Sequence, residues 1–69
     1  MNDNKFITSV YKEGHQEYIN MSLVCTFYLF CEYCTNTICF NLINGKTIIW
    51  EYETEKKAKD EYSRIINLL

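Results

Sequence analysis

The sequence contains no proline and only two glycines, Gly14 and Gly45. Linkers between domains are typically rich in glycine, serine or proline, and no stretch of this chain has that composition. Internal repeats and low-complexity segments are missing as well. We therefore expect residues 1–69 to form a single domain, close to the lower size limit for one hydrophobic core.

A long apolar run is also missing. The longest candidate, Leu23–Cys31, includes Thr26 and is much shorter than the roughly 20 residues that cross a bilayer as a helix. Met1–Lys5 is not followed by the apolar core of a secretory signal. We expect a cytoplasmic protein without membrane contact, in which the four cysteines are reduced.

Positive charge is scarce, with seven Lys and Arg against nine Asp and Glu, for a net charge of -2. Proteins bind nucleic acids largely through Lys and Arg contacts to phosphate, so this balance argues against a nucleic-acid partner. Lys56, Lys57 and Lys59 form a basic cluster near Arg64, but acidic residues are interleaved with them, as on a solvated helix face.

Hydrophobic and aromatic residues are abundant, at 48% and 16%, which is typical of a folding chain. Asn, Ile, Lys and Tyr together supply 27 of the 69 residues. This bias follows AT-rich codons and indicates a low-GC bacterium, or one of its phages or mobile elements, as the source.

The segment 37–53 has the pattern of a β-hairpin. Apolar residues alternate in Thr37–Leu42 and Lys46–Glu53, on either side of an Asn-Gly pair. A three-residue loop with Gly45 left-handed pairs Ile38 with Trp50. A two-residue loop would bring a carboxylate onto the apolar face, so burial favours the longer loop. The resulting face carries Ile38, Phe40, Leu42, Ile48, Trp50 and Tyr52.

A β-rich run, Leu23–Tyr33, precedes this hairpin. A two-residue turn at Thr35-Asn36 would place Cys31 opposite Phe40 and extend the same apolar face. By strand alternation, the run is expected to contribute four core residues. These are Cys25, Phe27, Leu29 and Cys31.

The remaining segments complete the fold prediction. Lys5–Lys12 and Glu17–Asn20 read as two strands around a turn at Glu13-Gly14-His15. Thr54 is a suitable N-cap for a C-terminal helix with an apolar stripe. The stripe consists of Ala58, Tyr62, Ile65, Ile66 and Leu69. The sequence therefore predicts an α+β domain: an antiparallel meander of four to five strands with the helix packed on one face.

The cysteines raise the question of a metal site, because Cys31 and Cys34 have a spacing found in zinc proteins. Strand alternation opposes this interpretation. Cys25 and Cys31 would face the core, Cys39 would point to the opposite side of the sheet, and Cys34 would lie in or beside a turn. The four thiols could therefore not converge on one metal ion. We expect no metal and no cofactor, with the cysteines acting as small apolar residues.

No catalytic group can be assembled from the sequence. No serine, cysteine or lysine has an identifiable base partner, and the single histidine, His15, falls in a predicted turn. The prediction is therefore a protein that is not an enzyme.

The face of the sheet opposite to the helix is the more informative feature. Several of its residues are too apolar for a solvated surface, and exposed apolar patches usually mark interfaces. Unless the first hairpin or a curved sheet covers them, they are candidate interface or ligand-binding residues. The candidates are Val24, Tyr28, Phe30, Cys39 and Ile49, with His15 from the neighbouring turn.

Three functional interpretations follow, in order of preference. The first is a small interaction protein that forms a homodimer and binds, and thereby inhibits, an unidentified host protein. The second is a protein that sequesters a nucleotide-like ligand in a pocket at a dimer interface, lined by Tyr28, Phe30 and His15. The third is nucleic-acid binding through the basic cluster of the helix and Arg64.

The order of turns and strands in the middle of the chain resembles that of a known protein family. Gly14, Tyr18-Ile19-Asn20 and Leu42–Lys46 are arranged as in the swarming-motility protein family of flagellar operons, which the chain resembles over residues 14–46. The resemblance implies a short β-rich fold and no catalytic residues. This chain departs from the pattern in its cysteine-rich third strand and in its C-terminal helix.

Overall fold

The computed structural model describes residues 5–12 and 14–69. It contains five strands, one short 3-10 turn and one helix. They are β1 (Phe6–Tyr11), β2 (His15–Asn20), the 3-10 turn Met21–Leu23, β3 (Val24–Glu32), β4 (Thr35–Leu42), β5 (Thr47–Glu51) and α1 (Glu55–Leu68). The predicted α+β class, with antiparallel strands and a C-terminal helix, is confirmed.

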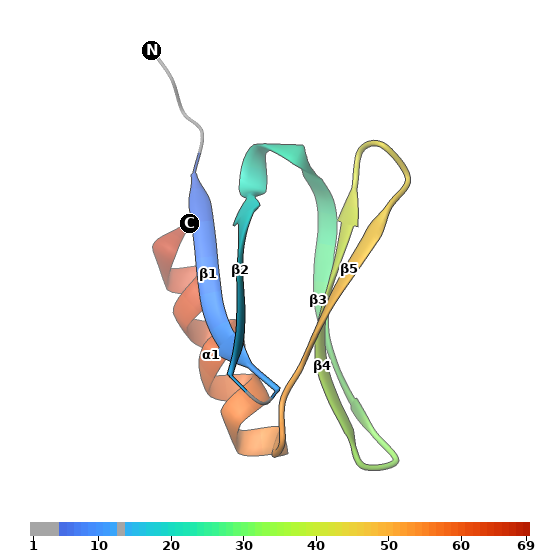
Figure 1. Ribbon diagram of the computed structural model, residues 1–69, viewed down its shortest axis with the longest axis vertical. Coiled ribbons are helices and arrows are strands. Elements are labelled where there is room, and N and C mark those ends of the chain that lie inside the picture. Colours follow the sequence, from blue (N-terminus) through green and yellow to red (C-terminus); the bar gives the residue numbers. More distant parts are fainter. Residues whose placement is uncertain (1–4, 13) are drawn as a thin grey trace.

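The strands form two antiparallel sheets instead of one continuous meander. β1 pairs with β2, and β3, β4 and β5 form a second sheet with β4 in the middle. Figure 1 shows the β1–β2 hairpin and α1 together on one side of the three-stranded sheet. We call the side of this sheet that faces them the inner face and the opposite side the outer face.

The predicted register of the last hairpin is confirmed. Ile38 lies opposite Trp50 and Phe40 opposite Ile48. Gly45 is left-handed, with φ of 89°. A side chain is rarely tolerated in this conformation, which explains why glycine stands at this position of the loop.

The predicted register between β3 and β4 is wrong by four residues. The turn lies at Tyr33-Cys34, whose φ angles are 50° and 64°, and not at Thr35-Asn36. Cys31 therefore lies opposite Asn36 and not opposite Phe40, and Leu29 lies opposite Ile38. Because side chains alternate with a period of two, this shift leaves every residue on its predicted face.

A β-bulge at the start of β3 does change the faces. The register shifts between Val24 and Thr26, so the residue between them, Cys25, is extra in the strand. Such an insertion reverses the alternation beyond it. Cys25 is exposed, in contrast to its predicted core position, and Val24 packs against the core instead of lying on the outer face.

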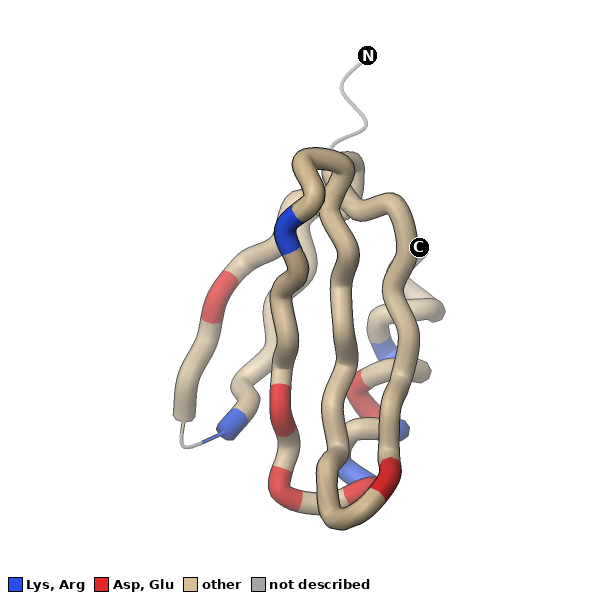
Figure 2. The backbone as a smooth tube through the Cα atoms, turned by 90° about the vertical axis from the view of Figure 1, so that its right-hand side faces the viewer, with Lys and Arg blue, Asp and Glu red and all other residues tan. Residues whose placement is uncertain are grey.

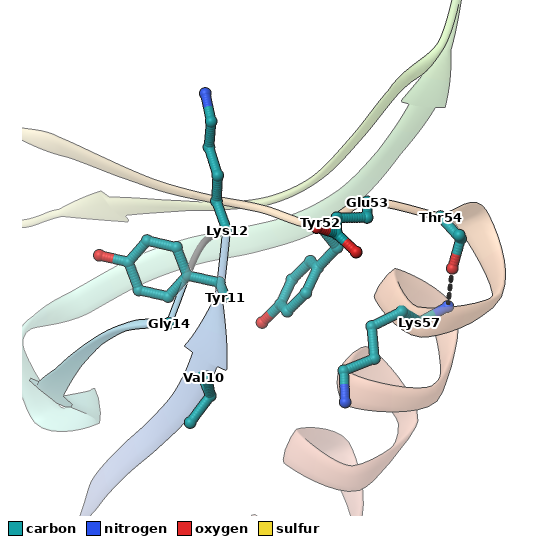
Figure 3. Close-up of a pocket in the computed structure, with 8 residues that line it drawn as sticks. All are labelled: Val10, Tyr11, Lys12, Gly14, Tyr52, Glu53, Thr54 and Lys57. Carbon is teal, nitrogen blue, oxygen red and sulfur yellow. Dashed lines mark hydrogen bonds between the residues drawn. The ribbon is translucent and has the colours of Figure 1, made fainter.

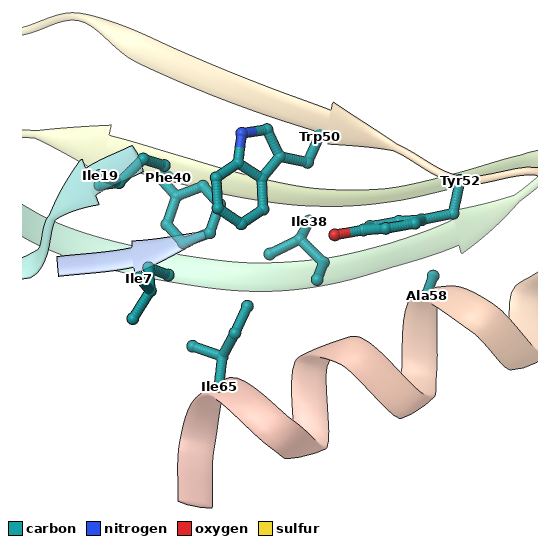
Figure 4. Packing of buried hydrophobic residues seen from close by; sticks show 8 residues of the cluster. All are labelled: Ile7, Ile19, Ile38, Phe40, Trp50, Tyr52, Ala58 and Ile65. Carbon is teal, nitrogen blue, oxygen red and sulfur yellow. The ribbon is translucent and has the colours of Figure 1, made fainter. Parts of the chain in front are cut away.

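The core lies between the inner face and the layer formed by the first hairpin and α1. Figure 4 shows Ile65 and Ala58 pointing from the helix toward the sheet, with Trp50 and Phe40 side by side above Ile7. Eight buried residues form this cluster. They are Ile7, Ile19, Ile38, Phe40, Trp50, Tyr52, Ala58 and Ile65.

The helix begins as predicted and buries a narrower stripe than predicted. The hydroxyl of Thr54 accepts a hydrogen bond from the backbone N–H of Lys57 at 3.1 Å, which caps the first turn. Ala58 and Ile65 are buried, and Tyr62 packs half-buried beside them. Two predicted stripe residues are exposed instead, Ile66 and Leu69.

Trp50 is the contact point of the first hairpin with the three-stranded sheet. Its indole is fully buried and stacks on the ring of Tyr11, with centroids 5.5 Å apart and planes at 16°. It meets Phe40 edge-on at 4.8 Å. The indole N–H donates a hydrogen bond of 2.9 Å to the carboxylate of Glu17. One side chain thus contacts β1, β2 and β4.

A chain of polar contacts links β1, the segment after β5 and the helix. The hydroxyl of Tyr52 donates to Ser9 at 2.8 Å, and the hydroxyl of Ser9 donates to Glu61 at 2.8 Å. Arg64 donates to Glu61 at 2.8 Å and to the backbone carbonyl of Thr8 at 2.6 Å. Hydrogen bonds to a partly buried carboxylate are among the stronger ones in proteins.

Replacement of Trp50 by alanine is expected to lower the free energy of unfolding by about 3–5 kcal/mol, because a large aromatic side chain is removed from a packed core. This is a large part of the stability of so small a domain. Urea denaturation followed by circular dichroism measures it, with Tyr33→Ala in the exposed turn as the matched control. A Trp50→Ala variant as stable as the control would contradict the packing described above.

Glu61 gives a pH-dependent prediction. Partial burial raises the pKa of its carboxyl group, but hydrogen bonds from Arg64 and Ser9 outweigh this and leave the pKa below its usual value. A carboxylate with a lowered folded-state pKa stabilises the protein above its unfolded pKa of about 4.3, and this stabilisation is lost as the pH falls through the folded pKa.

Glu61→Gln is therefore expected to cost about 1–2 kcal/mol at pH 7 and progressively less below about pH 4. Glu55→Gln removes a solvent-exposed pair with Lys59 and is expected to have a much smaller effect than Glu61→Gln at pH 7. Urea unfolding of the parent and both variants at pH 7 and pH 3 measures the difference. A Glu61→Gln effect that is the same at both values would show that the charge of Glu61 does not contribute.

Candidate functional site

The outer face of the three-stranded sheet is not covered by any element of the described chain. Figure 2 looks directly at this face, with the helix and the first hairpin behind it. The first hairpin packs on the inner face, where Ile7 and Ile19 enter the core. The structure thus decides the question that the sequence left open, because neither the hairpin nor the helix covers the outer face.

Two rows of residues cross the outer face at right angles to the strands. In the first row, Tyr28 on β3 lies opposite Cys39 on β4, which lies opposite Ile49 on β5. The second row consists of Phe30, Thr37 and Glu51 in the same order. Each row has its smallest side chain on the central strand.

This size pattern produces a hollow along β4 with a volume of about 430 Å³. Its floor is Thr37 and Cys39, which are only 5% and 7% exposed although no other element lies over them. Its walls are the half-exposed side chains of Tyr28, Phe30 and Ile49, at 46%, 41% and 55%. Thr35 and Glu51 complete the lining.

The polar groups on the floor are already engaged. The hydroxyl of Thr37 donates to the carbonyl of Phe30 at 3.2 Å and lies 3.8 Å from the sulfur of Cys39. A hydrogen bond with Cys39 raises the pKa of the Tyr28 phenol. Within the described residues, every buried side-chain nitrogen or oxygen has a hydrogen-bond partner. The hollow therefore offers apolar contact and shape, and no polar group on its floor that requires a ligand.

Four of the six predicted site residues come together at this hollow: Tyr28, Phe30, Cys39 and Ile49. Val24 does not, because the bulge at Cys25 turns it toward the core. His15 does not line the hollow either. It is the first residue of β2 instead of a turn residue, and its ring packs edge-on against Tyr11 at 5.9 Å.

The four cysteines are distributed as separate thiols. Cys25 and Cys34 are exposed, Cys31 packs against the core, and Cys39 lies on the outer face. In the described ranges, 5–12 and 14–69, no group of three or more His, Cys, Asp or Glu side chains is placed to hold a metal ion.

A second groove, of about 390 Å³, lies between the end of β1 and the start of α1. Figure 3 shows Tyr52 there between Tyr11 on one side and Thr54 and Lys57 on the other. No pattern in the sequence indicates this groove, because it joins the segment around Tyr11 to the segment around Tyr52, which are far apart along the chain. Its tyrosines are held by hydrogen bonds to Glu17 and Ser9, and its lysine at the hairpin, Lys12, pairs with Glu51 at 3.4 Å.

The basic cluster of the helix is largely neutralised by its neighbours. Lys56 pairs with Asp60 at 2.8 Å, and Lys59 pairs with Glu55 at 2.6 Å. The hydrogen bonds that Lys56 and Lys59 donate to these carboxylates raise the pKa of both lysines. Arg64 is engaged with Glu61. This arrangement reduces the attraction that the cluster would exert on phosphate groups.

Comparison with protein-family models, with curated proteins and with solved structures gives no significant match to this chain. The resemblance to the swarming-motility family therefore stays a prediction. Among the described residues, no helix combines the length and apolarity needed to span a membrane.

The distribution of thiols predicts that the purified protein contains far less than one equivalent of zinc. Zinc requires about four ligands converging at roughly 2.3 Å, and these thiols lie on different faces. Elemental analysis measures the zinc content, and a chelator should leave the circular dichroism spectrum unchanged. One tightly bound zinc ion per chain would contradict the placement of Cys34 and Cys39.

Proposed function

We propose that this protein is a small non-enzymatic binding protein that acts as a homodimer, with the outer face carrying residues of the contact. The observation that carries the proposal is the hollow on the uncovered face, where three large apolar side chains stand half-exposed around a buried floor. Tyrosine and phenylalanine are enriched at the centres of protein interfaces.

The chemistry of the outer face supports binding over catalysis. Its floor thiol contacts a phenol and a threonine hydroxyl, neither of which is a general base at neutral pH. The walls offer apolar surface, and covering such a side chain fully is worth about 1.5–3 kcal/mol. This gain is available only when another surface packs against Tyr28, Phe30 and Ile49.

We also propose that the dimer binds a protein of its host and thereby inhibits it. The abundance of Asn, Ile, Lys and Tyr, which AT-rich codons encode, supports a phage or mobile element of a low-GC bacterium as the setting. The cytoplasm is the compartment that suits four free thiols, because such thiols are maintained in a reducing environment.

Phe30→Glu is expected to convert the dimer into a folded monomer, because a charge would replace an apolar contact in both copies of a twofold interface. Phe30 lies on the outer face, so the core should keep its packing and the circular dichroism spectrum should stay unchanged. Sedimentation equilibrium measures the change. The matched control is Tyr18→Glu, which introduces the same charge at an exposed aromatic residue of β2.

Two results would count against this proposal. A parent protein that remains monomeric at high micromolar concentration would exclude the homodimer. A Phe30→Glu variant that dimerises as strongly as Tyr18→Glu would exclude the outer face as part of the contact.

A further inference from the structure

The outer face by itself is too small for a stable interface. Seven residues line its hollow, whereas a specific interface usually engages about 20–30 residues on each side. If the protein is a dimer, the contact has to extend beyond the hollow. The two wall residues Tyr28 and Phe30 stand on β3, which forms one edge of the three-stranded sheet.

The backbone groups along the free edge of β3 can be identified from the pairing. Glu32 and Thr35 close a two-residue turn and therefore form a hydrogen-bonded pair. Such pairs recur at every second residue, so Phe30 and Tyr28 also direct their N–H and C=O groups toward β4. Phe27, Leu29 and Cys31 direct theirs away from the sheet.

These outward groups have no partner in the described part of the chain. No backbone hydrogen bond from another element reaches Phe27, Leu29 or Cys31. Other edges are better protected. The carbonyl of Thr8 on β1 accepts from Arg64, and that of Glu51 on β5 accepts from the backbone N–H of Lys12 at 2.9 Å.

The sequence of β3 also lacks the residues that usually prevent edge pairing. Natural proteins protect exposed edges with lysine, proline or short strands. β3 is nine residues long, and its sequence, VCTFYLFCE, contains no lysine, arginine or proline. This edge is therefore suited to accept another strand.

We propose that two copies of the chain pair antiparallel along their β3 edges, with the twofold axis at Leu29, to form one continuous six-stranded sheet. This inference rests on the proposed homodimer and specifies where its subunits meet. The strand order becomes β5-β4-β3 in one subunit, continued by β3-β4-β5 in its partner.

The register follows from where β3 is regular. The bulge at Cys25 ends the regular stretch on one side and the turn at Tyr33 ends it on the other, so it covers Thr26–Glu32. Leu29 is its midpoint. Pairing about this residue matches Leu29 with its own copy and Phe27 with Cys31, which forms about six hydrogen bonds, two per pair.

The same register is favourable for the side chains. On the outer face it sets Tyr28 of one copy opposite Phe30 of the other, as a non-hydrogen-bonded pair in which side chains are closest. Glu32, the only charged residue of β3, falls opposite Thr26 instead of its own copy. The two hollows then lie on one continuous surface, which leaves Ile49 of each copy available to a protein partner.

Amide hydrogen exchange tests this inference on the parent protein. In the monomer, the amides of Phe27, Leu29 and Cys31 should exchange fast, while those of Tyr28 and Phe30 are protected by pairing with β4. At a total protein concentration of about 100 times the dissociation constant, about 7% of the chains are still monomeric, so exchange at the three outward amides should become more than about 10-fold slower. Nuclear magnetic resonance at two concentrations reads each amide separately.

A pair of proline variants provides the matched control. Cys31→Pro removes an outward N–H without breaking the β4 ladder, and proline is tolerated at such edge positions. We expect it to be a folded monomer by circular dichroism and sedimentation. Thr47→Pro makes the same change at an outward position of β5 and should leave the dimer intact.

The outcomes separate this inference from the proposed function. Slower exchange of the outward amides at high concentration supports the edge contact. A dimer whose outward amides stay fast would overturn the edge contact and leave a homodimer that meets elsewhere. A monomer at every concentration would overturn the proposed homodimer as well. The exchange measurement decides the matter even if Cys31→Pro does not fold.

Discussion

The burial of the Trp50 indole is the constraint on which the rest of this structure depends. The indole occupies the middle of the inner face, where Phe40, Tyr11 and Glu17 meet it from three different strands. An apolar group of this size is stable in so small a domain only if other elements close over it. The first hairpin supplies that closure, together with the helix, which contributes Ile65 and Ala58 to the same core.

This closure has a consequence for the opposite face. The described residues supply one further hairpin and one helix to cover the three-stranded sheet, and both pack on the inner face. The outer face therefore relies on its own side chains. Tyr28, Phe30 and Ile49 shield Thr37 and Cys39 but remain half-exposed themselves. A small domain with this arrangement has an apolar surface ready for association.

The sequence was most informative where two independent signals agreed. The register of the last hairpin followed both from the glycine that its loop requires and from the burial of Trp50. The turn before β4 could not be predicted in the same way, because registers that differ by an even number of residues place the same side chains on the same face. Tyr33 and Cys34 adopt left-handed conformations that their residue types do not favour, so turn composition pointed to the wrong place.

The same reasoning explains what could be predicted of the candidate site. Tyr28, Phe30, Cys39 and Ile49 were placed on one surface by strand alternation, which a register shift of four residues does not affect. Val24 was misplaced because the bulge at Cys25 has no distinct signal in the sequence. His15 was misplaced because the position of the first hairpin depends on contacts between distant segments, such as that between Glu17 and Trp50.

The most direct test of this account measures which face of the sheet the solvent reaches. A soluble paramagnetic agent broadens the nuclear magnetic resonance signals of side chains that it can approach. In dilute protein, the account predicts strong broadening for Tyr28 and Phe30 and sharp signals for Trp50 and Phe40. Broadening of Trp50 as strong as that of Tyr28 would contradict the closure of the inner face, on which the whole interpretation depends.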